Sequence, residues 1–506
     1  MNLKKQLNKT KEIFSMKQYL LGVDNGGTST KAAIFSLDGN EIAVSTLPTP
    51  QIIPEAGWAE RDMNVLWNTT AKVIKEAIKK AGISGGEIAC VGCTGHGKGL
   101  YMKGKDGANI YNAIASTDSR AASIITEWQN DGTVARASEL NCQRVIACQP
   151  VALLAWLKRN MPNIYSQIGT IFEAKDYIRF MLTGEAFAEM TDISGTGLLN
   201  LHTRSYDSAL LDMFGIPEIA ACLPPLALST DVCGHVTKKA SAETGLAEGT
   251  PVCGGMFDID ACAVAMDVTD EDSICAITGT WSINEYLSKT TVKPDSTTLN
   301  SLFCIPEYYL IEESSPTSAG NLEWIIAQFM EGKYSADTDI YAKVNALVES
   351  TPPADSGIIF LPFLYGTNVP HITEGALIGL NSACGLPQIL RAVFEGVVFS
   401  HKYHIDKLLS HREEPLSIRL SGGAAKSEVW TQMFADILGL PVEVIGVREL
   451  GTLGCCMAGA VAAGIYDSYK SAAAAMTGEI RKVYPNTSLA SIYTAKYHKY
   501  LRALGC

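Results

Sequence analysis

Two short apolar runs joined by a glycine turn open the regular part of the chain. The first run is Tyr19–Val23 and the second is Lys31–Ser36, with Gly26 and Gly27 in the turn between them. This pattern is typical of a β-hairpin, because glycine adopts the backbone conformations that a tight turn requires. The sequence therefore predicts a hairpin turn near the start of the fold.

The elements that follow predict a mixed sheet covered by helices. Glu41–Thr46 and Ile88–Cys93 have the apolar content of strands. Between them, Val65–Ala81 carries an apolar stripe at helical spacing, and Asp62 or Asn64 can cap this helix. Strands alternating with helices in this way predict an α/β fold.

A second half of the chain repeats the same features. The middle, about 120–245, is mostly helical in its pattern, and the second half begins near Thr250. It contains a glycine turn at Gly279-Thr280, and the strand Ile418–Leu420 runs into a further glycine pair. Two halves that each place a glycine turn after a strand predict a duplicated architecture.

Composition narrows the classes of function. The chain has 506 residues, of which 47% are hydrophobic and 19% charged, and its net charge is −12. These proportions are typical of a folded protein, and the length exceeds what one core can hold. An acidic surface repels nucleic acid and anionic membranes, so neither is an expected partner. No apolar run reaches the roughly 18 residues of a membrane span.

The N-terminus and the cysteines favour a cytoplasmic protein. The extension 1–18 is rich in lysine and lacks the apolar segment of a signal peptide, and Met16 is an alternative start. We expect the 14 cysteines to be reduced thiols. Cys90 and Cys93 form an isolated C-x-x-C, for which a redox role is the alternative to a plain buried strand. No second pair stands at zinc spacing.

The first turn has the composition of a phosphate-binding loop. The segment Asp24–Lys31 offers consecutive backbone N–H groups together with the hydroxyls of Thr28, Ser29 and Thr30. Such a turn can cradle phosphate oxygens. The preceding Asp24 can hold Mg²⁺, since a hard cation prefers oxygen ligands. The alternative is an ordinary tight hairpin, and the Walker A sequence is absent.

Four longer stretches carry a resemblance to a known family. They are Pro54–Met63, Gly95–Leu100, Ser315–Trp324 and Glu395–His401. In these stretches, and over nearly the whole chain, the sequence resembles the FGGY carbohydrate kinases. The resemblance implies an α/β, two-lobed fold of the actin/hexokinase ATPase type, with ribonuclease H-like domains around a central cleft.

The resemblance also implies an activity. We expect ATP-dependent phosphorylation of a small ketose such as L-xylulose or 3-keto-L-gulonate, at O5, with ATP and Mg²⁺ as cofactors. The alternatives are a kinase for another sugar or polyol, such as L-ribulose, D-xylulose, L-rhamnulose or glycerol, and a nucleotide-dependent sugar sensor. The partner is a small-molecule sugar, and a homodimer is among the expected assemblies.

The resemblance divides the chain and places its nucleotide site. It implies the extension 1–18, a sugar-binding N-terminal lobe over 19–249 and a nucleotide-binding C-terminal lobe over 250–506. A helix of small residues around Gly454, Ala458 and Gly459 would form the floor beneath the adenosine turn, or serve plain helix packing. The cofactor-binding residues would be Asp24 (also the metal ligand), Gly26, Gly27 and Thr28 in the first hairpin, Gly279 and Thr280 in the second turn, and Gly422, Gly423, Ala424 and Ser427 around adenosine.

The general base is implied by the same resemblance. It is the carboxylate that follows the turn Gly254-Gly255, which here is Asp258. The chemistry needs a carboxylate there to accept the proton of the attacking hydroxyl. Asp260 is the rival candidate, and for either residue the alternative is a helix cap.

The sugar contacts are expected mainly from the first half. They are Trp58, Glu60, His96, Lys98 and Asp118, together with the base Asp258, and Arg120 completes a polar cluster. An ordinary ion pair or solvated loop is the alternative for each. The cation of Lys98 could pair with a substrate carboxylate or donate to hydroxyls. In Pro150–Leu157 an apolar residue replaces the lysine that the family usually has, which argues against D-xylulose or glycerol specificity.

Overall fold

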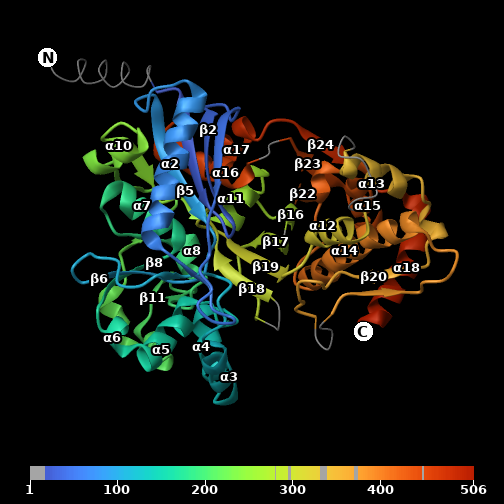
Figure 1. Cartoon of the computed structure of the whole chain (residues 1–506), viewed down its shortest axis with the longest axis horizontal. Coiled ribbons are helices and arrows are strands. Elements are labelled where there is room, and N and C mark those ends of the chain that lie inside the picture. Colours follow the sequence, from blue (N-terminus) through green and yellow to red (C-terminus); the bar gives the residue numbers. More distant parts are fainter. Residues whose placement is uncertain are drawn as a thin grey trace.

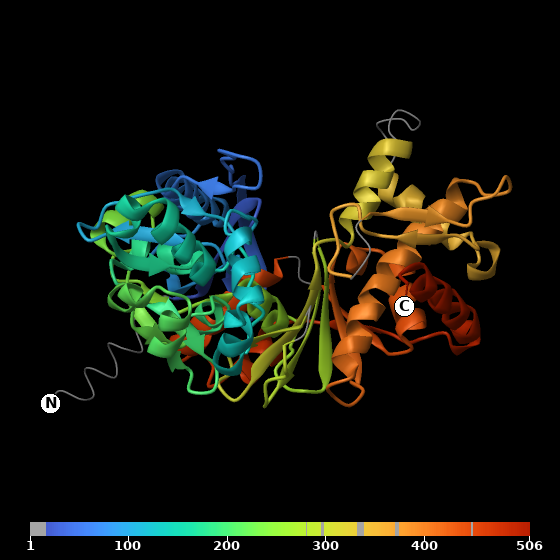
Figure 2. The same cartoon turned by 90° about the horizontal axis from the view of Figure 1, so that it is seen from below.

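The computed structural model describes residues 17–279, 281–294, 298–330, 339–369, 374–446 and 449–505. It has two α/β bodies, each built on one main sheet, which we call the first lobe and the second lobe (Figure 1). Seen from below, the two bodies lie side by side and are joined at the middle strands (Figure 2). Residues 1–16 of the predicted extension lie outside the described residues.

The first lobe is built on a sheet with the order β13-β14-β5-β1-β2-β3, with β15 also paired to β5. Asn25 stands opposite Thr30 where the first two strands meet, so the predicted hairpin is confirmed. The fourth predicted strand runs parallel to the first. The strands are β1 (Tyr19–Asn25), β2 (Ser29–Ser36), β3 (Glu41–Pro48), β5 (Ile88–Gly95), β13 (Val232–His235), β14 (Pro251–Cys253) and β15 (Met256–Phe257).

Helices cover both faces of this sheet. Alternate residues of a strand point to opposite faces. Leu20 and Phe35 accordingly pack in one apolar cluster with α11 and α16, while Leu21 and Ile34 pack in another with α2 and α7. The helices are α2 (Met63–Ala81), α7 (Ala174–Thr183), α10 (Lys238–Thr244), α11 (Asp258–Ala265), α16 (Leu450–Ala462) and α17 (Tyr469–Met476).

The long helix predicted in the first half has its expected cap. The carboxylate of Asp62 accepts hydrogen bonds from the N–H groups of Asn64 and Val65, at 2.7 and 3.0 Å. Gly82 ends the helix in the left-handed conformation, at φ 69°. The remaining prediction of a mostly helical middle segment is confirmed as well.

That middle segment adds helices and short strand pairs below the first lobe (Figure 1). Its helices are α3 (Ala122–Asn130), α4 (Thr133–Asn141), α5 (Pro150–Asn160), α6 (Pro162–Tyr165), α8 (Met190–Ser194), α9 (Ser208–Met213) and the 3₁₀ turn η1 (Pro217–Cys222). Its strand pairs are β9 (Ala188–Glu189) with β12 (Leu226–Ala227) and β10 (Leu199–Asn200) with β11 (Ser205–Tyr206). Its strand β8 (Ile168–Phe172) pairs with the earlier strand β6 (Tyr101–Gly104), and β4 (Glu60–Arg61) pairs with β7 (Ala113–Ile114) before the segment begins.

The second lobe is built on a sheet with the order β18-β19-β17-β16-β22-β23-β24. The strands are β16 (Ser273–Thr278), β17 (Ser282–Ser288), β18 (Thr298–Leu302), β19 (Tyr309–Ser315), β22 (Ser417–Gly422), β23 (Val442–Ile445) and β24 (Ile480–Val483), with the separate pair β20 (Ile359–Leu361) and β21 (Ala376–Ile378). The helices are α12 (Gly320–Phe329), α13 (Ile340–Glu349), α14 (Leu386–Leu409), α15 (Glu428–Leu438) and α18 (Ala490–Ala503), with 3₁₀ turns η2 (Pro353–Asp355), η3 (Ala424–Lys426) and η4 (Thr487–Leu489).

The two sheets repeat one connection pattern. β1 pairs antiparallel with β2 and parallel with β5, and β16 pairs antiparallel with β17 and parallel with β22. The predicted duplicated architecture is therefore present. The two lobes do not divide at residue 250, however, because β14 pairs with β13 and β5. The first sheet thus takes in strands on both sides of the expected boundary.

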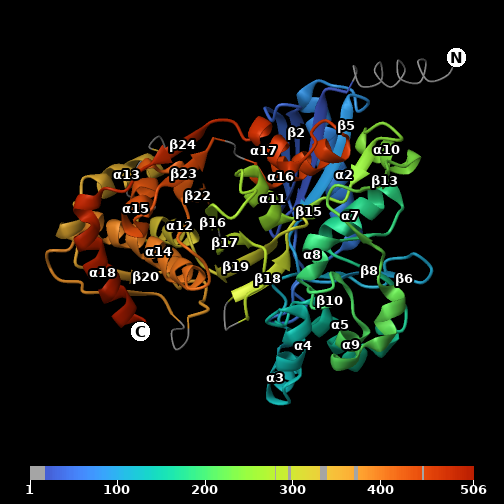
Figure 3. The ribbon, with the colours of Figure 1, turned by 180° about the vertical axis from the view of Figure 1, so that it is seen from behind.

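The helix of small residues, α16, does not lie where it was expected, beneath the adenosine turn. It packs on β1, β5 and α11 of the first lobe, and not beneath the adenosine turn (Figure 3). A β-carbon on Gly454 would lie 2.0 Å from the carbonyl oxygen of Ala261, and one on Gly92 would lie 2.1 Å from that of Cys455. The small residues therefore let this helix approach the strands and α11 at backbone distance.

Among the described residues, no helix has the length and apolar character that a membrane crossing requires. None of the described cysteines is in a disulfide. In the same part of the chain, no three His, Cys, Asp or Glu side chains are grouped as ligands for a metal ion.

Candidate active site

The first glycine turn is held from behind by an arginine. The guanidinium of Arg61, which is 1% exposed, donates to the carbonyl of Gly26 at 3.2 Å and also to the carbonyl of Gly27. In a trans peptide the N–H points away from the carbonyl. The N–H groups of Gly27 and Thr28 therefore point away from Arg61, on the exposed side of the turn. This is the geometry of an anion-binding nest.

Asp24 lies beside this turn with an unsatisfied oxygen. Its Oδ1 atom is buried and has no hydrogen-bond partner among the described residues. Burial and the charge of Glu449 raise the pKa of Asp24 to about 6, although Lys31 opposes this shift. Lys31 is itself ion-paired with Glu449 at 2.9 Å. A buried acceptor without a partner is costly, so Asp24 is suited to receive a cation or a donor.

Asp258 is the first residue of α11 and lies near Asp24. Burial and the charge of Asp24 raise the pKa of Asp258 to about 8, while Lys98 and the N–H of Ile259 lower it. Its carboxyl thus combines a raised proton affinity with a position at the positive end of a helix. A group with a pKa near the working pH is suited to accept and return a proton.

Asp260 lies in a different environment. It is fully buried, and its Oδ1 accepts a hydrogen bond from the N–H of Cys304 at 3.2 Å. Burial and the carboxylates of Glu189 and Glu285 raise its pKa well above the ordinary value. A buried, protonated carboxyl bonded to the backbone has no access to a substrate hydroxyl. The geometry favours Asp258 over Asp260 as the base.

Lys98 is a cation whose charge interacts with that of Asp258. It has a left-handed backbone, at φ 65°, which is uncommon for a residue with a side chain. Its Nζ atom lies 5.8 Å from the centre of the Phe257 ring. Burial disfavours its charge, but nearby carboxylates, Glu312 and Asp258 among them, outweigh this effect and raise its pKa. Lys98 is therefore a charged ammonium group beside the base.

The second lobe contributes two acidic side chains to the same region. Glu285 and Glu312 stand directly opposite each other on β17 and β19. Their neighbours Leu287 and Leu310 pack in the same cluster as α11, so this face of the sheet is turned toward the helix that carries Asp258. Both oxygens of Glu285 are buried without a partner, and burial raises its pKa well above the ordinary value.

Three of the predicted sugar contacts form a closed network in the first lobe. The guanidinium of Arg120 donates to Glu60 at 2.8 Å and to Asp118 at 2.9 Å. Both oxygens of Glu60 also accept hydrogen bonds, from Tyr111 at 2.6 Å and from Asn112 at 2.9 Å. Both carboxylates are therefore satisfied inside the protein, and of the guanidinium only Nη1 lacks a hydrogen-bond partner among the described residues.

Trp58 and His96 were expected to contact the sugar, but both side chains already contact other residues of the first lobe. Arg120 lies 4.0 Å from the centre of the Trp58 ring, and Trp58 packs edge-on against Trp156 at 5.1 Å. His96 is 6% exposed and is hydrogen-bonded to the hydroxyl of Tyr101 at 3.0 Å. Burial and the charge of Arg61 lower the pKa of His96 to about 3, so its ring is neutral.

The two predicted nucleotide turns of the second lobe meet each other. The N–H of Gly423 donates to the carbonyl of Thr278 at 2.7 Å, and the N–H of Ala424 donates to its hydroxyl at 3.0 Å. Gly422 has φ 87°, and a β-carbon there would lie 2.4 Å from the Thr278 carbonyl oxygen. Gly279 follows directly, so the turn predicted for phosphate and the turn predicted for adenosine form one surface.

The predicted nucleotide-binding residues also include Thr280 and Ser427. Thr280 lies outside the described residues. Ser427 is 6% exposed, caps α15 by accepting from the N–H of Trp430 at 3.2 Å, and donates to Asn345 at 2.7 Å. Its hydroxyl therefore serves the local fold.

Comparison with known families identifies the fold. The N-terminal domain of the FGGY family of carbohydrate kinases matches residues 19–265, and the C-terminal domain matches residues 274–463. The chain belongs to the FGGY family of carbohydrate kinases. The first FGGY match ends at residue 265, where α11 ends. It continues past the boundary expected at residue 250, as the first sheet does with β14 and β15.

Relatives of known name share most of the chain. The L-xylulose/3-keto-L-gulonate kinase of Escherichia coli K12 is 36% identical over 486 residues, which are 96% of each chain. A probable L-xylulose kinase of Haemophilus influenzae is 36% identical, over 96% of this chain and 98% of that protein. The autoinducer-2 kinase of Yersinia pestis is 28% identical, over 94% and 92%.

Solved structures confirm the two-lobed actin/hexokinase-type fold. A xylulose kinase from Lactobacillus acidophilus superposes with a TM-score of 0.87 at 23% identity, over 96% of this chain and 97% of the other. The Plasmodium falciparum glycerol kinase with ADP superposes with a TM-score of 0.85 at 20% identity, over 96% and 98%. The protein is a carbohydrate kinase, and kinases of this family use ATP.

Arg61, Glu285 and Glu312 are site residues that the sequence reasoning missed. Arg61 stands inside a quoted family stretch, but no local pattern shows that it would reach the turn 26–27. The two glutamates interrupt otherwise apolar strands, and an acidic residue in a buried strand was an available signal. Their approach to α11 depends on how the two lobes meet.

Proposed function

We propose that this FGGY kinase transfers the γ-phosphoryl group of ATP to O5 of a small ketose, L-xylulose or 3-keto-L-gulonate. The observation that carries the proposal is the position of Asp258, a partly buried carboxylate between Asp24 and Lys98. The name of the E. coli relative, which is 36% identical over 96% of the chain, supports this choice of sugar.

In the proposed reaction, Asp258 accepts the proton of the sugar hydroxyl. The freed oxygen forms a bond to the γ-phosphorus, and the bond from that phosphorus to the bridging oxygen of ADP breaks. A pKa of about 8 lets Asp258 hold this proton and then release it to solvent. The N–H groups of Gly27 and Thr28 would hold the oxygens of the transferred group, because Arg61 keeps them directed outward.

Asp24 fits the expected Mg²⁺. Its Oδ1 atom is buried without a partner, and a carboxylate oxygen is a ligand that this cation prefers. When bound, Mg²⁺ would offset the negative charge of the phosphates. The cation would also reduce the electrostatic repulsion between Asp24 and Asp258.

Lys98 supports a sugar that carries a carboxylate. Its charge interacts with that of the base, and its pKa stays raised although it is buried. A substrate carboxylate would replace the acidic neighbours that now stabilise its charge. We propose that Trp58, Glu60, Asp118 and His96 shape the sugar site from behind, since Glu60, Asp118 and His96 are already hydrogen-bonded and the Trp58 ring lies against Arg120.

The proposed setting is the cytoplasm, where the reducing environment suits the free thiols that the structure describes. In that setting both ATP and phosphorylated sugars are retained.

Production of ADP from ATP and Mg²⁺ across a sugar panel tests the proposal. The panel contains L-xylulose, 3-keto-L-gulonate, D-xylulose, L-ribulose, D-ribulose, L-rhamnulose, glycerol and a blank without sugar. We expect the highest kcat/KM with one of the first two sugars. A preference for another member would keep the kinase and replace the sugar. Hydrolysis of ATP independent of any sugar would favour a nucleotide-dependent sensor.

A further inference from the structure

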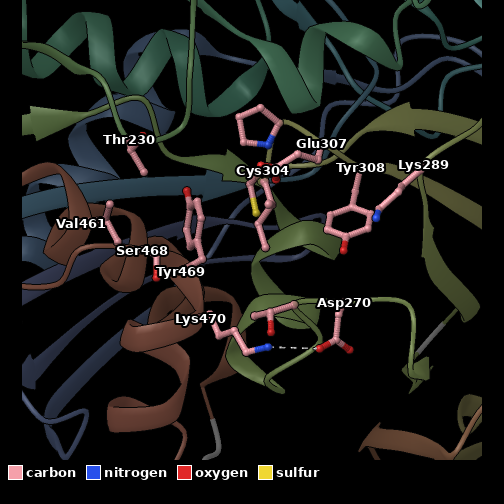
Figure 4. Close-up of a pocket in the computed structure, with 13 residues that line it drawn as sticks. Thr230, Asp270, Lys289, Cys304, Glu307, Tyr308, Val461, Ser468, Tyr469 and Lys470 are labelled. Carbon is pink, nitrogen blue, oxygen red and sulfur yellow. Dashed lines mark ion pairs between the residues drawn. The ribbon is translucent and has the colours of Figure 1, made fainter.

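A second cavity lies between the two lobes and shares no residue with the site around Asp258. Its volume is about 580 Å³. Figure 4 shows its side chains projecting from several separate elements. It is lined by Thr230, Thr269, Asp270, Lys289, Cys304, Ile305, Pro306, Glu307, Tyr308, Val461, Ser468, Tyr469 and Lys470.

The walls of this hinge cavity come from both lobes. Val461, at the end of α16, and residues 468–470, at the start of α17, belong to the first lobe. Residues 304–308 join β18 to β19, and Lys289 follows β17, so these belong to the second lobe. Thr269 and Asp270 lie in the segment that links α11 to β16. A molecule in the hinge cavity would touch both lobes and one of their connections.

The hinge cavity has an uncharged floor and a charged rim. Cys304 and Tyr469 are 4% and 6% exposed. On the rim, Lys470 is 77% exposed and makes a long ion pair with Asp270, at 3.7 Å. Lys289 is also exposed, with its Nζ atom 5.9 Å from the centre of the Tyr308 ring. Two ammonium groups, one from each lobe, thus line the hinge cavity, and the one ion pair among them, Lys470 with Asp270, is exposed and long.

The floor offers hydrogen-bond groups that a ligand could use. The hydroxyl of Tyr469 is buried and has no hydrogen-bond partner within bonding distance in the described residues. Its polar neighbours are the thiol of Cys304 and the hydroxyl of Ser229, and the Ser229 hydroxyl donates to Glu189 at 2.7 Å. Figure 4 shows the Tyr469 hydroxyl directed toward the space between Thr230 and Cys304.

The start of α17 favours an anion at the same place. Ser468 caps this eight-residue helix by accepting from the N–H of Ser471 at 3.2 Å. The N–H groups of Tyr469 and Lys470 are the first of the helix and have no acceptor within it. They add positive potential to that of the two lysines. The opposing charges are Asp270, which is paired with Lys470, and Glu307 in the lining, together with Glu271 and Asp272, whose charges also reach Tyr308.

We propose that the hinge cavity binds a small polyol carrying a phosphate or carboxylate group. The oxyanion would lie between Lys289, Lys470 and the start of α17, and the hydroxyls of the ligand would meet Thr230, Thr269 and Tyr469. The volume of about 580 Å³ is within the range of small-molecule sites. Because the ligand touches both lobes, its binding is coupled to the angle between them, and so to the closure that assembles the active site.

The test uses the full chain saturated with a non-hydrolysable ATP analogue and Mg²⁺. Glucose 6-phosphate and gluconate supply the two kinds of oxyanion, and glucose supplies the polyol alone. Calorimetric titration should show binding of at least one anionic probe and weaker or no binding of glucose. The tighter of the two anionic probes identifies the preferred oxyanion. Lys289→Ala and Lys470→Ala should each weaken binding roughly tenfold, the order expected for one hydrogen bond to a charged group.

Matched variants locate the probe. Lys79→Ala and Lys499→Ala remove exposed lysines of the first and second lobes outside the cavity, and should leave binding unchanged. Thr230→Phe, which fills the hinge cavity, should abolish the effect of the probe on the KM for sugar while activity without probe persists. No binding of either anion at millimolar concentration would overturn the proposal. So would binding that Lys98→Met removes and Lys289→Ala does not, because the probe would then lie in the active site.

Discussion

Two groups of charged side chains in the first lobe differ in whether their carboxylate oxygens have hydrogen-bond partners. Glu60, Asp118 and Arg120 are buried and satisfy one another through hydrogen bonds of 2.8 to 2.9 Å. Asp24 and Asp258, by contrast, repel each other, have raised pKa values, and leave Asp24 Oδ1 without a partner.

The difference separates structural from chemical roles. A satisfied buried network stabilises one arrangement and resists change, because breaking it leaves uncompensated charge. An unsatisfied group stores free energy that a bound ligand can release. From sequence alone the two groups were predicted as one sugar and phosphate site. In the first group both carboxylates are satisfied and only the Nη1 atom of Arg120 lacks a partner among the described residues, whereas the second group has a carboxylate oxygen without one.

The largest expected effect is that of Asp258→Asn. An amide cannot accept the proton of the sugar hydroxyl, so kcat should fall by about 10²–10⁴-fold. ATP binding should persist, because the nucleotide turns are elsewhere. Steady-state kinetics and nucleotide titration measure the two properties. The matched variant Asp260→Asn should keep most of its activity, and loss of equal size in both variants would contradict the assignment of the base.

Arg120→Ala tests the satisfied network. Removing the guanidinium leaves Glu60 and Asp118 buried without their cation, so we expect a loss of about 3–5 kcal/mol in the free energy of unfolding. Denaturant unfolding measures this loss. Arg159→Ala is the control, because its ion pair with Glu127 is half exposed. A similarly small effect for both arginines would show that the network does not stabilise the first lobe.

The pH dependence of activity follows from the raised pKa of Asp258. The base acts in its ionised form, so kcat/KM should be level above about pH 8 and decline as the pH falls below it. At two pH units below this value the decline should be about a hundredfold. A pH–rate profile of the wild type checks this. A profile that stays level down to pH 5 would mean that the titrating group is not Asp258.

Lys98→Met tests whether the ammonium group of Lys98 binds a carboxylate on the sugar. The variant keeps the length of the side chain and removes its charge. KM for a carboxylated ketose should rise roughly tenfold or more, and KM for an uncharged ketose should change less. Comparing 3-keto-L-gulonate with L-xylulose in both proteins measures the difference. Equal changes for both sugars would assign Lys98 to hydroxyl or phosphate contacts.

The smallest expected effect concerns stability. A carboxyl with a raised folded-state pKa contributes stability when protonated, and that contribution is lost as pH rises from its ordinary pKa toward about 8. Asp258→Asn should therefore be more stable than the wild type at pH 8, by about 1 kcal/mol. The same variant at pH 4 should show little difference. A destabilised variant at pH 8 would indicate that Asp258 has a partner that supports the fold.

Local chemistry made much of the fold predictable. The hairpin over 19–36 and the helix over 65–81 follow from apolar spacing, a glycine turn and the cap at Asp62, all within a few residues. The glycine turns at 279 and 422 were equally visible. Asp24 could be named because it stands beside the first glycine turn, and Asp258 because the resemblance to the FGGY family implies a carboxylate shortly after the turn Gly254-Gly255.

Long-range packing decided the rest. The small residues of α16 indicated close contact but not the surface they meet, which is the first sheet, more than 350 residues earlier in the chain for Gly92 and Cys455. The partners of Arg61 and the cross-strand pair Glu285 and Glu312 depend likewise on how distant segments meet.

The sequence by itself determined the glycine turns, because these depend on residue type and short spacing. Through its resemblance to the FGGY family it also indicated the carboxylates proposed for phosphoryl transfer. Only the tertiary structure decided which polar groups are satisfied and which are left free. That distinction arises when burial removes water from a side chain, and only the surrounding fold determines whether another group replaces it.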